Sequence, residues 1–108
     1  MSTTDVGEGG RVAGRWTFLT NHAHVLVHLS RDPEARLSDI AVAVGVRERA
    51  VQRLIGDLVE AGYLERERVG RRNRYVLHLD IGLRHPLEGD HSVGELIGIF
   101  SGDDLDAA

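Results

Sequence analysis

The feature that most constrains the fold is a single glycine, Gly45, which separates two stretches of helical periodicity. A sharp turn between two helices needs a residue in the left-handed conformation, and glycine adopts it at little steric cost. Ala41, four residues earlier, is small enough to let the two helices cross steeply, and Val46 fills the core beneath the turn. We therefore predict a helix-turn-helix over residues 37–54.

Apolar residues at helical spacing predict three helices in this part of the chain. The first spans about residues 21–30 and has Thr20 as its cap. The second has Ser38 as its expected N-cap and stops at Gly45. The third runs from residue 47 to about residue 61. The faces expected to be buried are Ala23, Leu26, Val27 and Ser30 in the first helix, widened by Val25 and Leu29, then Ile40, Ala41 and Val44 in the second, and Val51, Leu54, Ile55, Leu58 and Val59 in the third.

A β-hairpin is expected after the third helix. Residues 63–69 and 74–79 are two extended runs, and the polar residues 70–73 form a turn of hairpin length between them. Every second residue from Tyr75 to Leu79 is a large apolar one, so one face of the second run is expected to pack and the other to stay exposed. The predicted fold class is mainly α with a small β-hairpin, that is, a three-helix core plus a wing.

A short fourth helix is expected near the end of the chain. Ser92 and Glu95 have the spacing of a capping box, in which each side chain binds the other residue's backbone amide. Two glycines weaken this helix, so it should need a surface to pack against. We expect it to pair with a second copy of the chain, and packing on its own domain is the alternative. The predicted dimer interface is its apolar stripe, which comprises Val93, Leu96, Ile97 and Phe100.

The length of 108 residues corresponds to about one domain. We expect a flexible leader over residues 1–15 and the helical domain with its hairpin over residues 16–80. Residues 81–108 are expected to hold a linker, the short amphipathic helix and a frayed acidic tail. Trp16 and Phe18 are expected to cover the core as a hydrophobic plug, with an effector pocket or a dimer contact as the alternatives.

Charge is divided unevenly along the chain, although the net charge is −4. All 13 basic residues are arginine. From Arg47 to Arg74, eight arginines against five acidic residues leave an excess of three positive charges. From residue 80 to residue 108, one arginine against seven acidic residues leaves an excess of six negative charges. Such a division is typical of a protein with a local anion-binding surface.

Several classes of protein are excluded or disfavoured. The chain has no cysteine, which excludes disulfide scaffolds, thiolate zinc sites and thiol catalysis. It has no apolar run long enough for a membrane span and no visible signal peptide, so a soluble, cytoplasmic protein without a membrane partner is expected. No nucleotide-binding or metalloprotease motif occurs, and neither enzymatic activity nor a cofactor is predicted.

Some of the histidines have the spacing of metal ligands. His24 and His28 stand four residues apart, a spacing that can bind zinc on a helix. A second candidate group comprises His85, Glu88, Asp90 and His91. No carboxylate completes the first pair locally, and we predict no metal site. A pH-dependent role of His22 and His24 near an interface is a further alternative.

The residues around the turn, with residues 60–64 (Glu-Ala-Gly-Tyr-Leu) and the arginine-tipped hairpin at 70–75, resemble those of a known family. The chain is similar to winged helix-turn-helix transcriptional regulators of the broad MarR/ArsR-like bacterial type over about residues 17–79. It departs from them at Arg47, where the family usually has a serine or threonine that caps the recognition helix. The resemblance implies binding of double-stranded DNA, with the third helix in the major groove and the wing on the backbone or minor groove.

Exposed polar residues on the third helix and the wing form the candidate DNA site. Arginine matches guanine in the major groove and glutamine matches adenine, while Glu48 either accepts from cytosine or orients a neighbouring arginine. The wing arginines are assigned to phosphate or the minor groove, where they add affinity without sequence choice. The predicted DNA-binding residues are Ser38, Arg47, Glu48, Arg49, Gln52, Arg53, Arg71, Arg72, Asn73 and Arg74.

A homodimer is expected, because one recognition helix reads only a few base pairs. The sequence leaves open whether a small-molecule effector is sensed. The alternative function is that of a winged-helix module that contacts proteins and has no specific DNA site. The negative net charge is the main argument for that alternative.

Overall fold

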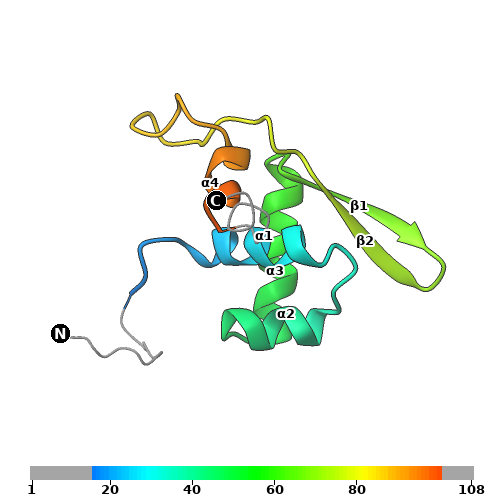
Figure 1. The fold of residues 1–108 in the computed structure, drawn as a ribbon. Helices are drawn as coiled ribbons and strands as arrows, with labels where there is room; N and C mark the ends of the chain where they lie inside the picture. Colours follow the sequence, from blue (N-terminus) through cyan, green and yellow to red (C-terminus); the bar gives the residue numbers. More distant parts are fainter. Residues whose placement is uncertain (1–15, 101–108) are drawn as a thin grey trace.

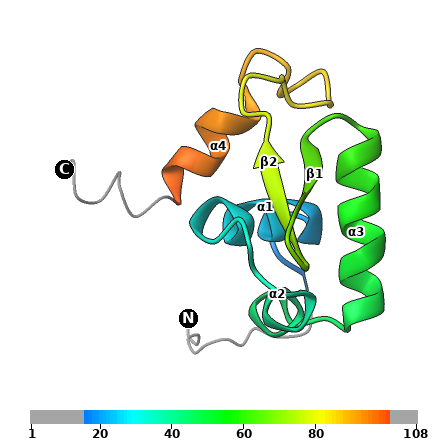
Figure 2. The same ribbon diagram turned by 90° about the vertical axis from the view of Figure 1, so that its right-hand side faces the viewer.

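The computed structural model describes residues 16–100. Its elements along the chain are α1 (Asn21–Arg31), α2 (Leu37–Val44), α3 (Glu48–Glu60), β1 (Leu64–Val69), β2 (Arg72–Leu77) and α4 (Val93–Ile99). The first three helices pack on one another, and the hairpin of β1 and β2 projects from one side of them (Figure 1). In the view turned by 90°, α3 and α4 stand on opposite sides of the hairpin (Figure 2). The predicted fold class, a three-helix core with a hairpin wing and a C-terminal helix, is confirmed.

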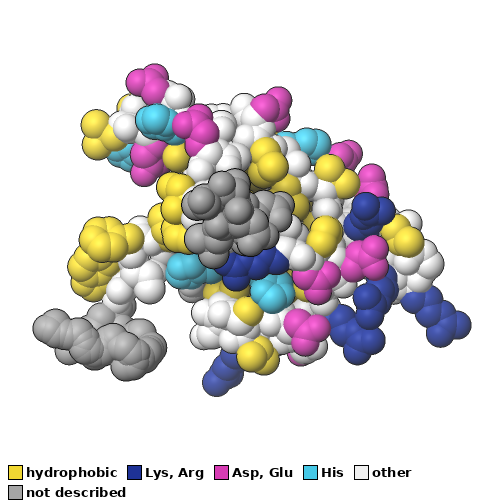
Figure 3. Space-filling model, in the orientation of Figure 1, with side chains coloured by type: hydrophobic (Ala, Val, Ile, Leu, Met, Phe, Trp, Pro, Cys, Tyr) yellow, Lys and Arg dark blue, Asp and Glu magenta, His cyan; other side chains and the backbone are white. Residues whose placement is uncertain are grey.

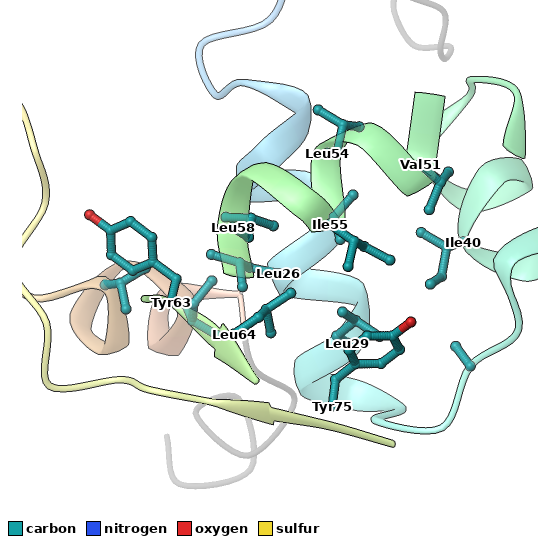
Figure 4. Close-up of a cluster of buried hydrophobic side chains, with 14 of the residues drawn as sticks. Leu26, Leu29, Ile40, Val51, Leu54, Ile55, Leu58, Tyr63, Leu64 and Tyr75 are labelled. Atoms are coloured by element: carbon teal, nitrogen blue, oxygen red, sulfur yellow. The ribbon is translucent and has the colours of Figure 1, made fainter. Parts of the chain in front are cut away.

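One hydrophobic core holds these elements together (Figure 4). Its largest fully buried side chains come from all three N-terminal helices and are Val25, Leu29, Ile40, Val51 and Ile55. Within residues 16–100 no polar or charged residue is buried. Burying each such aliphatic side chain contributes roughly 1.5–3 kcal/mol. Apolar packing, and not a buried polar network, therefore positions the surface residues described below.

The first helix begins as predicted but buries a different face. The Thr20 hydroxyl accepts a hydrogen bond from the amide three residues later, at 3.4 Å. The buried residues are Val25, Leu26 and Leu29, whereas Ser30, which was expected on the buried face, is exposed. The reason is that α1 packs against both α2 and α3. The centre of its buried face therefore includes Val25 and Leu29, which were expected only to widen that face.

Ser38 is not the N-cap of the second helix. The cap is Arg36, which has extended backbone angles and whose carbonyl accepts the first helical hydrogen bond, from Ile40 at 3.0 Å. Ser38 therefore lies inside the first turn and is exposed. A capping side chain accepts from the amide two or three residues later, and the amides at those positions after Ser38 already donate within the helix, so the expected capping bond does not form.

The turn between α2 and α3 has the predicted geometry. Gly45 ends α2 in the left-handed conformation, with φ at +88°, and its amide donates to the carbonyl of Ala41 at 2.8 Å. The third helix begins one residue after Arg47, whose side chain makes no capping hydrogen bond. Gly62, with φ at +92°, follows its end. Both predicted ends of α3 are correct to within one residue.

The turn of the hairpin is shorter than predicted. The strands pair antiparallel with Val69 opposite Arg72, so only Gly70 and Arg71 form the turn. Arg72 and Asn73, expected in the turn, belong to β2. Gly70 has φ at +62°, the positive value that two-residue hairpin turns require. Arg72 and Arg74 are therefore held on a paired strand, whereas Arg71 lies in the turn.

The second strand is anchored at its middle. Tyr75 is buried, and its amide donates to the carbonyl of Pro33 in the α1–α2 connection at 2.9 Å. Leu77 is half-buried and is the last residue of β2. Leu79, which was expected on the packed face, lies beyond the strand and is 44% exposed. The alternation therefore stops where the strand stops.

The fourth helix packs on its own domain. Val93 and Ile97, both expected at a dimer interface, are instead buried in this chain's own core, beside α1. Leu96 is half-buried, and Phe100 remains 38% exposed. For these two buried residues, the alternative of packing on the chain's own domain holds.

Two local features position α4. The predicted capping box is present: the Ser92 amide donates to Glu95 Oε2 at 3.0 Å, and the Glu95 amide donates to Ser92 Oγ at 3.1 Å. The Gly94 amide donates to the carbonyl of Leu79 at 2.8 Å. A Cβ at Gly94 would lie 2.7 Å from the same carbonyl oxygen. The helix therefore approaches the chain after β2 at a distance that requires glycine.

The aromatic residues ahead of α1 do not cover the core. Trp16 is 75% exposed and Phe18 is 92% exposed, and their rings meet edge to face with centroids 5.2 Å apart. The predicted plug was therefore wrong, because Val93 and Ile97 of α4 complete the core. The predicted leader, residues 1–15, lies outside the described residues.

Candidate nucleic-acid interface

The outer face of α3 carries the predicted recognition residues. Its inward face comprises Val51, Leu54, Ile55 and Leu58, all buried as predicted. That packing turns the opposite face to solvent, and Arg49, Gln52 and Arg53 are exposed there in the first two turns. Three long polar side chains at the start of one helix suit contact with base edges in a major groove.

The beginning of α3 has no side-chain cap. Arg47 occupies the cap position with extended backbone and forms no capping hydrogen bond, while Glu48 follows in the first turn. Both side chains are exposed. The first amides of a helix point along its axis and favour a phosphate group. Glu48 near this positive end stabilises the helix but opposes a phosphate.

The wing carries exposed arginines on both of its faces. All five are exposed, and they are Arg66, Arg68, Arg71, Arg72 and Arg74. Glu67 lies directly opposite Arg74 in the strand register, and Glu34 Oε1 lies 3.9 Å from Arg72 Nη1. The exposed ion pair of Arg72 and Glu34 contributes little to stability, so Arg72 can exchange this carboxylate for a phosphate at low cost.

A groove of about 490 Å³ lies between the starts of α2 and α3 and the tip of the hairpin. Five of the predicted DNA-binding residues line it, namely Ser38, Glu48, Arg71, Arg72 and Asn73. The fold therefore brings together residues that are up to 35 positions apart in the sequence. The remaining predicted residues lie outside this lining and are Arg47, Arg49, Gln52, Arg53 and Arg74.

Arg36 is a residue of this groove that sequence reasoning missed. It is exposed at the N-cap of α2 and lines the groove with the wing arginines. The available signal was its position directly before the first helix of the helix-turn-helix. With Arg36 included, the groove holds three arginines against the two acids Glu34 and Glu48.

Arginine and acidic side chains are unevenly distributed over the surface. In Figure 3, arginine side chains gather over the hairpin, while several acidic side chains and histidines gather over the loop between β2 and α4. This arrangement agrees with the division of charge along the sequence. A polyanion is therefore attracted to the hairpin side of the molecule and repelled by the loop.

The histidines do not assemble a metal site in the described part of the chain. Within residues 16–100, no three histidine, aspartate or glutamate side chains lie close enough together to hold a metal ion. His22 Nε2 lies 2.9 Å from Asp57 Oδ2, and His91 Nδ1 lies 2.7 Å from Glu95 Oε1. The hydrogen bond that His91 donates to the Glu95 carboxylate, aided by the negative charge of that carboxylate, raises the pKa of His91, and the same bond lowers the pKa of Glu95. These histidines pair with single carboxylates.

None of the helices between residues 16 and 100 is both long enough and apolar enough to cross a membrane.

A helix-turn-helix followed by a hairpin, with exposed arginines on both, defines a winged helix-turn-helix protein. A sequence model of the MarR family matches residues 17–74, which is more than half of the chain. The chain therefore belongs to the MarR family.

Similarity to individual proteins is weaker. The crystal structure of a MarR family transcription regulator is 22% identical in sequence, with a TM-score of 0.47. The match covers 83% of this chain and 54% of that chain, so this chain spans about half the length of that protein. No curated protein matches.

Proposed function

We propose that this protein is a transcriptional regulator that binds a specific site in double-stranded DNA, with α3 in the major groove and the wing on the backbone or minor groove. The family match supports the general class, a DNA-binding regulator. The observation that carries the proposal is the groove of about 490 Å³, which places Ser38 and Glu48 beside the wing arginines Arg71 and Arg72. A duplex laid along this groove would meet both helices and the wing at once.

Base reading is assigned to the outer face of α3. Arg49 and Gln52 are one turn apart and exposed, so both can reach successive base pairs. Arg53 extends the same face, and Arg47 lies at its start. Glu48 is expected either to accept a hydrogen bond from a cytosine amino group or to orient a neighbouring arginine, because it would be repelled by phosphate.

Backbone contact is assigned to the wing and to the start of α2. Arg71, Arg72 and Arg74 supply positive charge, and Asn73 and Ser38 supply neutral donors. Such contacts fix the orientation of the protein on the duplex and carry no direct sequence information. They are expected to dominate the salt dependence of binding.

Two copies are needed for a site of useful length, and we include a homodimer in the proposal. With Val93 and Ile97 buried, the apolar residues of α4 left for a partner lie at its end, where Ile99 is 67% exposed and Phe100 is 38% exposed. Two recognition helices about one helical turn of DNA apart would then read two half-sites.

The test is a binding measurement on a site selected from random duplexes. Arg49→Ala and Gln52→Ala should each weaken binding to the selected site by about 1–3 kcal/mol and leave random-duplex binding nearly unchanged. Arg84→Ala is the matched control, because Arg84 is an exposed arginine in the acidic loop. If the parent shows no salt-dependent duplex binding, the protein-interaction module is the better description. If both α3 variants bind the selected site like the parent, the assignment of the recognition face is wrong.

A further inference from the structure

A large cleft lies at the opposite end of α3 from its recognition residues, and we propose that it binds an organic cation that carries apolar rings. The cleft has a volume of about 1,020 Å³. Small-molecule sites in proteins commonly have volumes of about 300–1,000 Å³. The cleft is therefore large enough for a compound of several rings. It shares no lining residue with the groove assigned to DNA.

The floor of the cleft is apolar and preformed. Leu26, Leu58, Tyr63 and Val93 line it, and each belongs to the buried core. The one polar group among these side chains, the Tyr63 hydroxyl, donates to the carbonyl of Gly82 at 2.9 Å and is already satisfied. These side chains are already almost fully buried, so the apolar surface that a ligand would remove from water belongs to the half-buried lining residues Leu19, Leu83 and Leu96. Such a ligand displaces no hydrogen bond of the tyrosine.

The rim of the cleft is negatively charged. It holds three carboxylates, Asp57, Glu60 and Glu88, against the single guanidinium of Arg84. The carboxylates of the rim therefore outnumber its guanidinium group by two. Asp57 and Glu60 also lie in the last turn of α3, where the helix dipole adds partial negative charge. An anionic ligand would be repelled here, and a cation would be attracted.

An exposed aromatic ring stands at the edge of the same cleft. Phe18 lines the cleft and is 92% exposed. Its ring makes an edge-to-face contact with the ring of Trp16, and the two ring centroids are 5.2 Å apart. A cation over the face of an aromatic ring is attracted by the ring quadrupole. The cleft therefore has an apolar floor, an acidic rim and an exposed aromatic ring. These features favour binding of a lipophilic cation over binding of a neutral or acidic compound.

The test compares two probes of the same shape and opposite charge, tetraphenylphosphonium and tetraphenylborate, added to the full chain at pH 8 without DNA. Trp16 is the only tryptophan of the chain and contacts Phe18, so its fluorescence reports occupancy of the cleft. Calorimetry provides a second readout. The phosphonium is expected to bind saturably and at least about tenfold more tightly than the borate. Equal binding of the two ions, tighter binding of the borate or no saturable binding overturns the proposal.

Paired substitutions test whether the rim is responsible. Glu60→Gln with Glu88→Gln should weaken phosphonium binding about tenfold and strengthen borate binding. The control is Glu65→Gln with Glu67→Gln, which makes the same charge change on exposed residues of β1, away from the cleft, and should alter binding by less than about twofold. Equal losses in both double variants would show that only net charge matters and would overturn the site.

Oligomeric state decides between this ligand and a protein partner. Sedimentation of the parent with and without the phosphonium is expected to show an unchanged mass. A mass that falls as the probe binds would mean that a second copy normally fills the cleft, and the proposal would be wrong. Because none of these measurements uses DNA, their outcome is independent of whether the DNA-binding proposal holds.

Discussion

Replacing Gly94 by alanine tests whether the docking of α4 depends on a close backbone approach. The added Cβ would lie 2.7 Å from the carbonyl oxygen of Leu79 and 2.9 Å from its Cβ. Contacts of this kind are ordinary only beyond about 3.4 Å, so the helix would have to move away by about 0.7 Å. The obstructing oxygen belongs to the backbone and accepts the Gly94 amide, so it cannot rotate aside as a side chain would.

Two terms of opposite sign determine the size of the effect. Overpacking of this kind destabilises by about 1–3 kcal/mol. Alanine in place of glycine within a helix stabilises by up to about 1 kcal/mol. The steric term is expected to win, with a net loss of about 1–2 kcal/mol. Undocking of the whole helix would instead expose Val93 and Ile97, each worth roughly 1.5–3 kcal/mol, which makes a small displacement the cheaper response.

Thermal unfolding followed by circular dichroism measures the result. For a domain of this size, 1 kcal/mol corresponds to a shift in Tm of about 4–8 °C. Gly56→Ala is the matched control, since it also places alanine in a helix but its Cβ meets no atom within 4 Å. It is expected to raise the Tm, while Gly94→Ala lowers it. A Gly94→Ala chain as stable as the parent would refute the reasoning, whatever the control does.

Three further predictions concern the wing, the assembly and pH. Arg71→Ala with Arg72→Ala should weaken binding to all duplexes alike and lower the slope of log K against log salt by about 1 for each lost contact. Ile99→Asp should give a folded monomer by light scattering if the end of α4 forms the dimer contact. The pKa of His91 is raised, so its stabilising contribution is present below its ordinary value of 6.5 and is lost as the pH rises through the raised value. The pKa of Glu95 is lowered, so its contribution is present above its ordinary value of 4.5 and is lost as the pH falls.

Each of these has an outcome that contradicts it. An unchanged salt slope would show that the wing does not touch DNA. A parent that is monomeric at micromolar concentration, or an Ile99→Asp chain that stays dimeric, would exclude the proposed contact. The pair of His91 and Glu95 is expected to stabilise α4 most between pH 4.5 and 6.5, as measured by urea unfolding. If Glu95→Gln unfolds with the same pH profile as the parent, the pair contributes nothing measurable.

Local rules were sufficient for the helix-turn-helix. A glycine in the left-handed region and a sustained 3.6-residue period are properties of the chain itself, so Gly45 and the buried face of α3 were predictable. Ser38 was misassigned because a good capping residue does not decide which residue begins the helix. The hairpin turn was misplaced because four consecutive polar residues allow several registers, and the positive φ of Gly70 selects one.

Long-range contacts were not predictable in the same way. An apolar stripe indicates that α4 will be buried, but it does not say whether its own domain or a partner covers it. The contact between Gly94 and Leu79 joins two segments without any recurring pattern. For the candidate site, exposure of the predicted α3 and wing residues followed from periodicity. Arg36 lies beside the wing arginines only because the wing packs near the start of α2. The hydrogen bond from the Tyr75 amide to the Pro33 carbonyl holds the wing there.

The two ends of the loop between β2 and α4 are held together by hydrogen bonds, so its length and sequence can change with little effect on the rest of the fold. Gly82 and Ser92 form a bridge, and the Leu83 amide donates to the carbonyl of His91 at 3.0 Å. With its ends held, lengthening the loop adds little entropic penalty, about 0.6 kcal/mol for each doubling. The loop supplies Arg84 and Glu88 to the cleft and nothing to the DNA groove. Exchanging this segment is therefore expected to change the lining of the cleft proposed for a ligand and to leave the groove proposed for DNA unaltered.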